Sequence, residues 1–126
     1  MTRRNISSGS HFEAAYGYSR AVVTGSQAFV SGTVGMNYAT GTIDPDAAMQ
    51  VGQIVANIEA ALAQADFGRA DIVQLTTYIA GAELMPVVGA ALGEAFGDIR
   101  PANTVVVVGF PVPGVLVEIS AVAVRG

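Results

Sequence analysis

A run of four valines after Thr104 is the feature that most limits how this chain can fold. The segment 104–108 is rich in β-branched residues and shows no alternation of polar and apolar positions. This pattern is typical of a strand buried on both faces, because a strand with one solvent-exposed face carries a polar residue at every second position. The sheet that contains this strand therefore needs cover on two sides.

The rest of the chain predicts one sheet and two helices. Residues 1–17 are small and polar, so we expect a loop or arm there. Apolar and β-branched runs predict further strands, of which the first two are joined by a hairpin turn at Gly25-Ser26. The predicted strands, with the valine run, cover residues 19–23, 28–34, 71–80, 104–108 and 115–124.

The longer predicted helix begins after Asp44-Pro45, where Asp44 can cap and Pro45 suits the first turn. Apolar residues then recur at helical spacing until the helix ends near Phe67-Gly68: Val51, Ile54, Val55, Ile58, Leu62 and Ala65. A second helix is expected over residues 84–96, before Gly97. The order β-β-α-β-α-β-β favours a single α+β domain over residues 1–126, with both helices on one face of the sheet.

Two helices can cover only one face, so the other face needs a different partner. Only 13% of the 126 residues are charged and 52% are hydrophobic, which leaves few charged side chains for the solvent-exposed surface of a monomeric domain. A second copy of the same chain is the simplest partner for this face. A membrane does not fit, because the longest uncharged stretch, residues 21–43, contains four glycines among polar residues and is not an apolar membrane-spanning segment.

The charge and cysteine content exclude several classes of function. A net charge of −4 with six scattered basic residues argues against a nucleic-acid partner. The chain has no cysteine, which excludes disulfides, thiolate metal sites and a cysteine nucleophile and fits a cytoplasmic protein. The amino-terminal residues lack the apolar core of a signal peptide.

Four segments, in this order, resemble the RidA/YjgF family of reactive-intermediate deaminases. They are Gly17-Tyr18-Ser19-Arg20-Ala21, Phe29-Val30-Ser31-Gly32-Thr33, Arg100-Pro101-Ala102-Asn103-Thr104 and the strand 117–124. The resemblance spans about residues 16–124. It implies a chorismate-mutase-like α+β fold and a homotrimer with three intersubunit clefts. It also implies hydrolysis of imine or enamine metabolites with neither a metal nor an organic cofactor. It also implies that Tyr18, Ser31, Gly32 and Thr104 line the cleft.

Three positions depart from the family pattern. The arginine that holds the substrate carboxylate, directly after Pro-Ala, is replaced by Asn103. The family glutamate that helps with the attacking water is replaced by Ser120, and a frequent tyrosine of the second helix by Gly93. Losing a charge-assisted hydrogen bond of about 1.5–3 kcal/mol should weaken carboxylate binding tenfold or more. Asn103 is therefore either part of a retuned pocket or a vestigial polar residue at a subunit seam.

The remaining charged candidates each have two interpretations. Glu118 shares a strand face with Ser120, so it could act as a general base or acid, or it could only pair with an arginine across an interface. Arg100 could reach an anion near Asn103, or it could be solvated. Glu13 could fold over the cleft with Tyr18, or it could be a solvated loop carboxylate, as we expect for His11.

Two functions follow from these residues. The first is a trimeric imine or enamine deaminase with altered substrate anchoring, in which Glu118 transfers protons and Asn103 orients a substrate also contacted by Arg100 and Ser120. The second is a trimer of the same fold that binds a small metabolite without turnover. A purely structural trimer is a weaker third interpretation.

Overall fold

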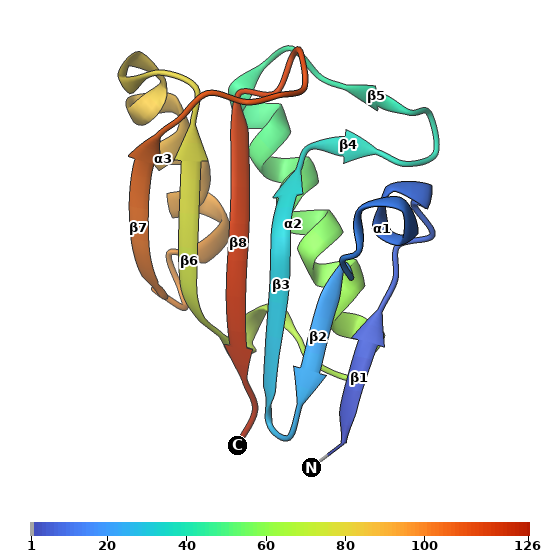
Figure 1. Ribbon diagram of the computed structural model, residues 1–126. Coiled ribbons are helices and arrows are strands. Elements are labelled where there is room, and N and C mark those ends of the chain that lie inside the picture. The colour runs from blue at the N-terminus through green and yellow to red at the C-terminus, as the bar shows by residue number, and fades with distance from the viewer. Residues whose placement is uncertain (1) are drawn as a thin grey trace.

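The computed structural model describes residues 2–126 and contains one six-stranded sheet. The strand order is β1-β2-β3-β8-β6-β7, antiparallel except for the parallel pair β6 and β7. Helices α2 and α3 lie together behind the sheet in Figure 1, and the short strands β4 and β5 form a separate pair. The elements are β1 Arg3–Ile6, α1 His11–Tyr16, β2 Ala21–Thr24, β3 Gln27–Val34, β4 Met36–Asn37, β5 Thr42–Ile43, α2 Ala47–Ala63, a 3-10 turn Arg69–Asp71, β6 Ile72–Ile79, a 3-10 turn Ala82–Leu84, α3 Met85–Phe96, β7 Ala102–Val107 and β8 Val117–Val124.

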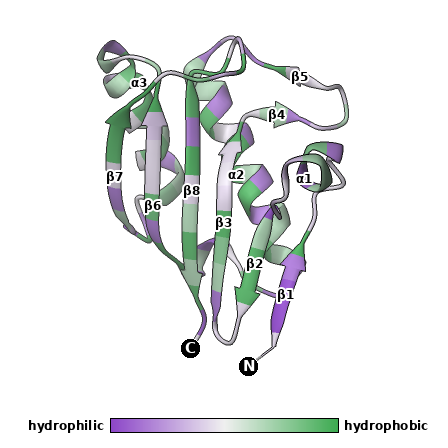
Figure 2. Cartoon of the chain, viewed as in Figure 1, coloured by the Kyte–Doolittle hydropathy of each residue, from purple (hydrophilic) through white to green (hydrophobic). Residues whose placement is uncertain are grey.

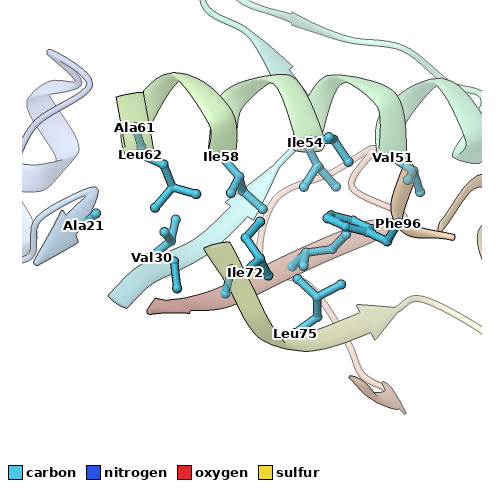
Figure 3. Packing of buried hydrophobic residues seen from close by; sticks show 14 of the residues in the cluster. Ala21, Val30, Val51, Ile54, Ile58, Ala61, Leu62, Ile72, Leu75 and Phe96 are labelled. Atoms are coloured by element: carbon cyan, nitrogen blue, oxygen red, sulfur yellow. The ribbon is translucent and has the colours of Figure 1, made fainter. Parts of the chain in front are cut away.

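The predicted α+β fold, with one mixed sheet and its two main helices on a single face, is confirmed. The apolar stripe of α2 packs on β3 and β8, as the close view in Figure 3 shows. The core joins this stripe to inward residues of the strands and of α3. Val51, Ile54, Ile58 and Leu62 from α2 meet Val30, Ile72 and Leu75 of the strands and Phe96 of α3. Helical and two-residue periodicities in the sequence therefore converge on one core.

The start of α2 differs from the prediction by two residues. Asp46 is the N-cap, and its Oδ2 accepts a hydrogen bond of 3.1 Å from the backbone N–H of Met49. Asp44 instead accepts from the backbone N–H of Asp46 at 2.9 Å, and α2 ends at Ala63, before the predicted Phe67-Gly68. Either aspartate fits the capping preference, so local sequence alone does not choose between them.

Gln50 ties α2 to the loop before β8. Its side chain is fully buried, donates to the carbonyls of Asp44 at 2.8 Å and Gly114 at 2.9 Å, and accepts from the backbone N–H of Leu116 at 2.9 Å. Gln50 is not one of the apolar residues that define the predicted stripe of α2. A buried amide that satisfies three partners explains why this polar residue lies inside.

The expectation of a loop over residues 1–17 is wrong for two segments. Arg3–Ile6 forms β1, paired with β2, and His11–Tyr16 forms the one-and-a-half-turn helix α1 between the Ser10 cap and Gly17, whose φ is 75°. Only Ile6 of β1 is buried. An edge strand with charged residues gives almost no periodic signal, and its backbone pairing shows only in the fold.

The valine run is not buried within this chain. The first three of its four valines form the second half of β7, which lies at one edge of the sheet, where Val106 is 38% and Val107 56% exposed. Figure 2, in which α2 and α3 lie behind the sheet, shows β7 as an edge strand with an apolar upper part. The prediction of a strand buried on both faces therefore fails for the single chain.

Candidate functional site

The sheet face turned away from α2 and α3, called the open face below, carries two rows of polar side chains. Alternation along β8 places Glu118 and Ser120 there, because Val117, Ile119 and Ala121 point into the core. Tyr78 of β6 lies opposite Glu118, and Thr76 lies opposite Ser120. Thr104 of β7 in turn lies opposite Thr76, so a line of three hydroxyl groups crosses three strands.

A bulge in β3 adjoins Glu118. The pairing of β3 with β8 shifts between Val30 and Thr33, so that Ser31 and Gly32 together face Ser120. The Ser31 hydroxyl donates to the carbonyl of Ser19 at 2.6 Å, which fixes the bulge to the segment before β2. The structure thus brings Ser31, Gly32, Glu118 and Ser120 together on neighbouring strands.

Glycine at position 32 leaves room for the Glu118 side chain in its present position. A Cβ on Gly32 would lie 2.9 Å from Cδ of Glu118 and 3.1 Å from each carboxylate oxygen. The carboxylate therefore rests directly on the peptide backbone of the bulge. Any larger residue at position 32 would displace it.

Glu118 is the titratable group whose environment best suits proton transfer. Burial raises the pKa of Glu118 above its usual 4.5, and the charge of Arg20 partly offsets that rise. A carboxyl group with a raised pKa keeps a proton more easily near neutral pH and is a better general acid or base. Hydroxyl groups on the neighbouring strands supply hydrogen-bond partners for a substrate beside it.

Arg20 is the functional candidate that the sequence reasoning missed. It is only 7% exposed, its Nη2 donates to the carbonyl of Gly32 at 2.8 Å, and its guanidinium carbon lies 6.0 Å from the centre of the Tyr18 ring. Arg20 stood in one of the quoted family segments, next to Tyr18. An arginine just before the apolar strand 21–24 was the available signal.

Glu13 is buried and not a solvated loop carboxylate. It is 6% exposed, and one carboxylate oxygen accepts from both the backbone N–H and the hydroxyl of Ser8. Burial opposes ionisation, but the hydrogen bonds from Ser8 and Ser7 and the charge of Arg20 together lower the pKa of Glu13. The solvated interpretation fails because α1 folds Glu13 inward, which a loop would not do.

Asn103 lies on the opposite side of the sheet from Glu118. Its register partner on β6 is Leu75, a core residue, and its Oδ1 accepts a hydrogen bond of 3.0 Å from the hydroxyl of Thr77, which is fully buried. Within one chain, Asn103 and Glu118 are therefore not neighbours. Asn103 is nevertheless exposed on the edge strand, where another molecule can reach it.

Arg100 is also distant from Glu118 within the chain. It lies in the turn after α3, with a φ of 57°, and its backbone N–H donates to the carbonyl of Phe96 at 2.7 Å. Val106 of β7 shares a row with Glu118. At the usual rise per residue, Ala102 at the start of β7 lies about 13 Å from Val106, and Arg100 comes before Ala102. Tyr18, by contrast, lies close to the bulge through its contact with Arg20.

Two cavities lie outside the open face. One of about 420 Å³ is lined by the β4–β5 segment and the start of α2 and contains none of the predicted site residues. The other, of about 180 Å³, is lined by Arg20, Tyr38, Asn57 and Gln64 among others. Neither includes Glu118, because the open face of a single chain lacks an opposing wall.

Within residues 2–126, no group of three or more histidine or acidic side chains is arranged to hold a metal ion. No helix in this part of the chain is long and apolar enough to cross a membrane.

The fold and the site define an α+β protein with a mixed sheet and a polar site beside a strand bulge on the open sheet face. Residues 8–125 match the family model described as Endoribonuclease L-PSP. The chain is similar to a RutC family protein of Aquifex aeolicus, with 34% identity over 110 residues that cover 86% of this chain and 88% of the relative. A RutC family protein of Pyrococcus horikoshii is 30% identical over 86% of both chains.

Solved structures agree with these relatives. The structure of Rv2704 from Mycobacterium tuberculosis, a member of the YjgF/YER057c/UK114 family, matches with a TM-score of 0.90 and 40% identity, over 98% of this chain and 100% of that one. TdcF of E. coli with bound serine matches with a TM-score of 0.81 and 27% identity, over 86% of this chain and 88% of that one. The chain therefore belongs to the RidA/YjgF family, which the matched model describes as Endoribonuclease L-PSP. The family predicted from the four sequence segments is confirmed.

Proposed function

We propose that this protein hydrolyses the C=N bond of a small imine, or of the enamine from which the imine forms, at a cleft on the open sheet face. The observation that carries the proposal is the half-buried Glu118 carboxyl group, which rests on Gly32 in a row of hydrogen-bonding side chains. Family membership supports the same reaction class. The cytoplasmic location, supported by the lack of cysteine, belongs to the proposal.

The proposed reaction needs one water molecule and one proton acceptor. Glu118 takes a proton from water as the water oxygen bonds to the imine carbon. A proton from solvent adds to the nitrogen, which gives an amino alcohol at that carbon. Glu118 then transfers its proton to the nitrogen and the C–N bond breaks. Ammonia leaves as the hydroxyl group of the amino alcohol releases its proton to solvent and the C=O bond of the product forms. Ser31, Ser120, Thr104 and Tyr18 bind and orient the substrate.

A homotrimer completes the site in this proposal. β7 is an edge strand with exposed valines, and the open face has no cover within the chain. A neighbouring copy that covers this face would supply the missing wall of the cleft. Asn103 and Arg100 adjoin that edge, so they take the substrate-orienting role across the subunit boundary and not beside Glu118 of their own chain.

The test measures ammonia release from a 2-imino acid and from a neutral imine, each against buffer. We expect the wild type to accelerate release from the neutral imine more than from the acid, because Asn103 offers no charge to a carboxylate. Glu118→Gln should lower kcat/KM by about 10²–10⁴-fold, the usual contribution of a general base. Glu59→Gln, an exposed glutamate of α2, is the control and should leave the rate unchanged.

The pH dependence gives a second measurement. Only the ionised Glu118 can accept a proton, so kcat/KM should fall as the pH is lowered through the pKa of Glu118, which lies above the usual 4.5 because of burial. A rate that Glu118→Gln leaves unchanged, or a rate that rises toward acid, would contradict the role of Glu118.

The alternative is a trimer that binds a small metabolite without turnover. The observation that favours it is the pair of departures at Asn103 and Ser120, of which Asn103 already bonds Thr77. TdcF of E. coli with bound serine supports small-ligand binding by a relative. Binding of serine by calorimetry, with no ammonia release from either imine, would favour this alternative.

The double variant Asn103→Arg, Ser120→Glu restores the two family residues. It should then gain activity toward the 2-imino acid if the rest of the cleft can support catalysis.

A further inference from the structure

Arg20 is a buried cation without an ion-pair partner. Its side chain is 93% removed from solvent, and its Nε is buried and has no hydrogen-bond partner among residues 2–126. In the same part of the chain the only ion pair joins Arg69 and Asp98. Burying a guanidinium under these conditions is costly, so its position calls for a physical reason.

The hydrogen bond that Arg20 makes leads directly to Glu118. Nη2 of Arg20 donates to the carbonyl oxygen of Gly32, and the Cα side of the same glycine lies against the Glu118 carboxylate. One glycine therefore contacts the guanidinium through its carbonyl and the carboxylate through its missing side chain.

A second carboxylate competes for the same cation. Glu13 of α1 is held inward by Ser8, and the charge of Arg20 stabilises its ionised form. Glu118 also lies within the field of Arg20. One arginine thus serves two carboxylates, of which Glu13 has strong hydrogen bonds of its own and Glu118 does not.

We propose that Arg20 is a positioning residue for Glu118: it fixes the Gly32 backbone on which the carboxylate rests and supplies the charge that Glu13 and Glu118 share. The role of Arg20 in catalysis rests on the proposed function, whereas its effect on the Glu118 carboxyl group does not. Because the Gly32 carbonyl is its hydrogen-bond partner, Arg20 acts on Glu118 through the backbone of the bulge as well as through space.

The groups that face Glu118 from the neighbouring strands carry no positive charge, unlike Arg20. Tyr78 of β6 lies opposite Glu118, and Tyr18 lies near Arg20. On β3, the neighbours are Gly32 and Val34, which do not titrate. Arg20 is therefore the cation that stabilises the ionised form of Glu118, and Glu13 is the second carboxylate that interacts with the same cation.

The test follows the Glu118 carboxyl carbon by NMR during a pH titration of the full chain labelled with ¹³C-glutamate, with Glu118→Gln to assign the signal. Arg20→Gln should move the Glu118 midpoint upward, because a stabilising cation is lost. Glu13→Gln should move it downward, because Arg20 then serves a single carboxylate. Arg4→Gln, which removes an exposed arginine of β1, is the matched control and should leave the midpoint unchanged.

Opposite shifts are a pattern that a merely structural role does not produce. A midpoint that Arg20→Gln leaves unchanged or lowers would overturn the proposal, and so would no change or a rise in Glu13→Gln. If Arg20→Gln does not fold, Arg20→Lys keeps the charge and should hold the Glu118 midpoint near that of the wild type. In a second sample labelled with ¹³C-glycine, the Gly32 carbonyl signal should move in this variant. An unmoved Gly32 signal would overturn the backbone part of the proposal. None of these outcomes depends on turnover, so they remain readable if no imine proves to be a substrate.

Discussion

The two faces of β8 differ in chemistry although they share one backbone. Val117, Ile119, Ala121 and Ala123 point into the core, whereas Glu118, Ser120, Val122 and Val124 point to the open face. The inward row meets α2 and is sealed by it, as the packing in Figure 3 illustrates for neighbouring strands. The outward row has no cover within the chain. The comparison teaches that a two-residue period separates the residues that stabilise this fold from those available for chemistry.

The largest effect should come from comparing one substitution on the two faces. Val117→Ala removes two buried carbons and should lower the free energy of unfolding by about 2–3 kcal/mol. Val122→Ala, on the outward row, should lower it by less than about 1 kcal/mol in a dilute monomer. Chemical denaturation at several protein concentrations measures both.

If Val122→Ala is as harmful as Val117→Ala even at the lowest concentration, the two faces do not differ as described. A Val122→Ala effect that grows with protein concentration would instead show that another copy covers the outward row.

A charge on the edge strand should have the next largest effect. If a second copy covers the open face, Val106→Lys places an ammonium group in that interface and should shift the assembly from trimer toward monomer. Val87→Lys, at an exposed valine of α3 on the helical side, is the matched control and should leave the assembly intact. Sedimentation velocity measures both variants, and equal behaviour would argue against an interface at β7.

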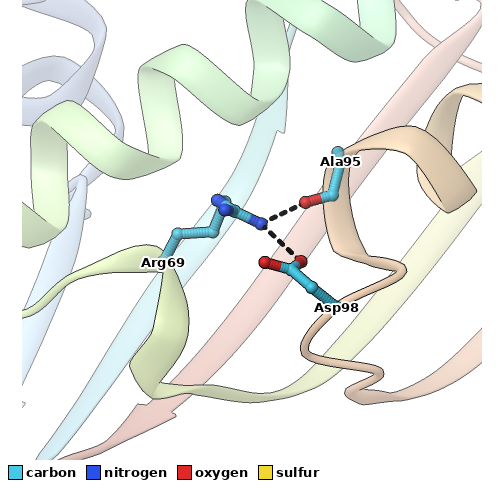
Figure 4. A network of polar contacts seen from close by, with 3 residues as sticks. All are labelled: Arg69, Ala95 and Asp98. Atoms are coloured by element: carbon cyan, nitrogen blue, oxygen red, sulfur yellow. Dashed lines mark hydrogen bonds and ion pairs between the residues drawn. The ribbon is translucent and has the colours of Figure 1, made fainter.

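The smallest effect should come from the exposed ion pair behind the sheet. Figure 4 shows Arg69, which donates to the Ala95 carbonyl and contacts Asp98 at 3.2 Å. The hydrogen bond from Arg69 lowers the pKa of Asp98, so the pair stabilises the fold above the usual 3.8 and loses this effect as the pH falls through the lowered value. Asp98→Asn should therefore reduce the free energy of unfolding at pH 7 by less than Val117→Ala or Val122→Ala. High salt should remove the difference in stability between Asp98→Asn and the wild type. A loss that persists in high salt would contradict this.

Arg20 and Arg69 explain why part of the site escaped sequence-based prediction. Arg69 lies at the surface with a partner that the fold brings from 29 residues away, whereas Arg20 is buried beside two carboxylates. Each is a single basic residue in a segment without other basic residues nearby. Nothing local distinguishes them, because burial depends on what α1 and the β3 bulge place around the side chain.

The candidate residues divide in the same way. Glu118, Ser120, Ser31 and Gly32 could be grouped from strand alternation and the family segments, and the fold places them on neighbouring strands. Asn103 is predicted to belong with them because it stands where the family has its carboxylate-binding arginine, and Arg100 because it lies three residues before Asn103. The register of β7 separates Asn103 from Glu118, because residues 103 and 104 of a strand face opposite sides.

The sequence by itself determined the α+β class, the two main helices, the hairpin and the family, because periodicity and turn residues act over short distances. It also determined that this chain carries more apolar surface than its helices can cover. Only the tertiary structure decided that the valine run is an exposed edge, that Glu13 and Arg20 are buried, and that Gly32 touches Glu118. These depend on strand register and on contacts between distant segments, which no local pattern encodes.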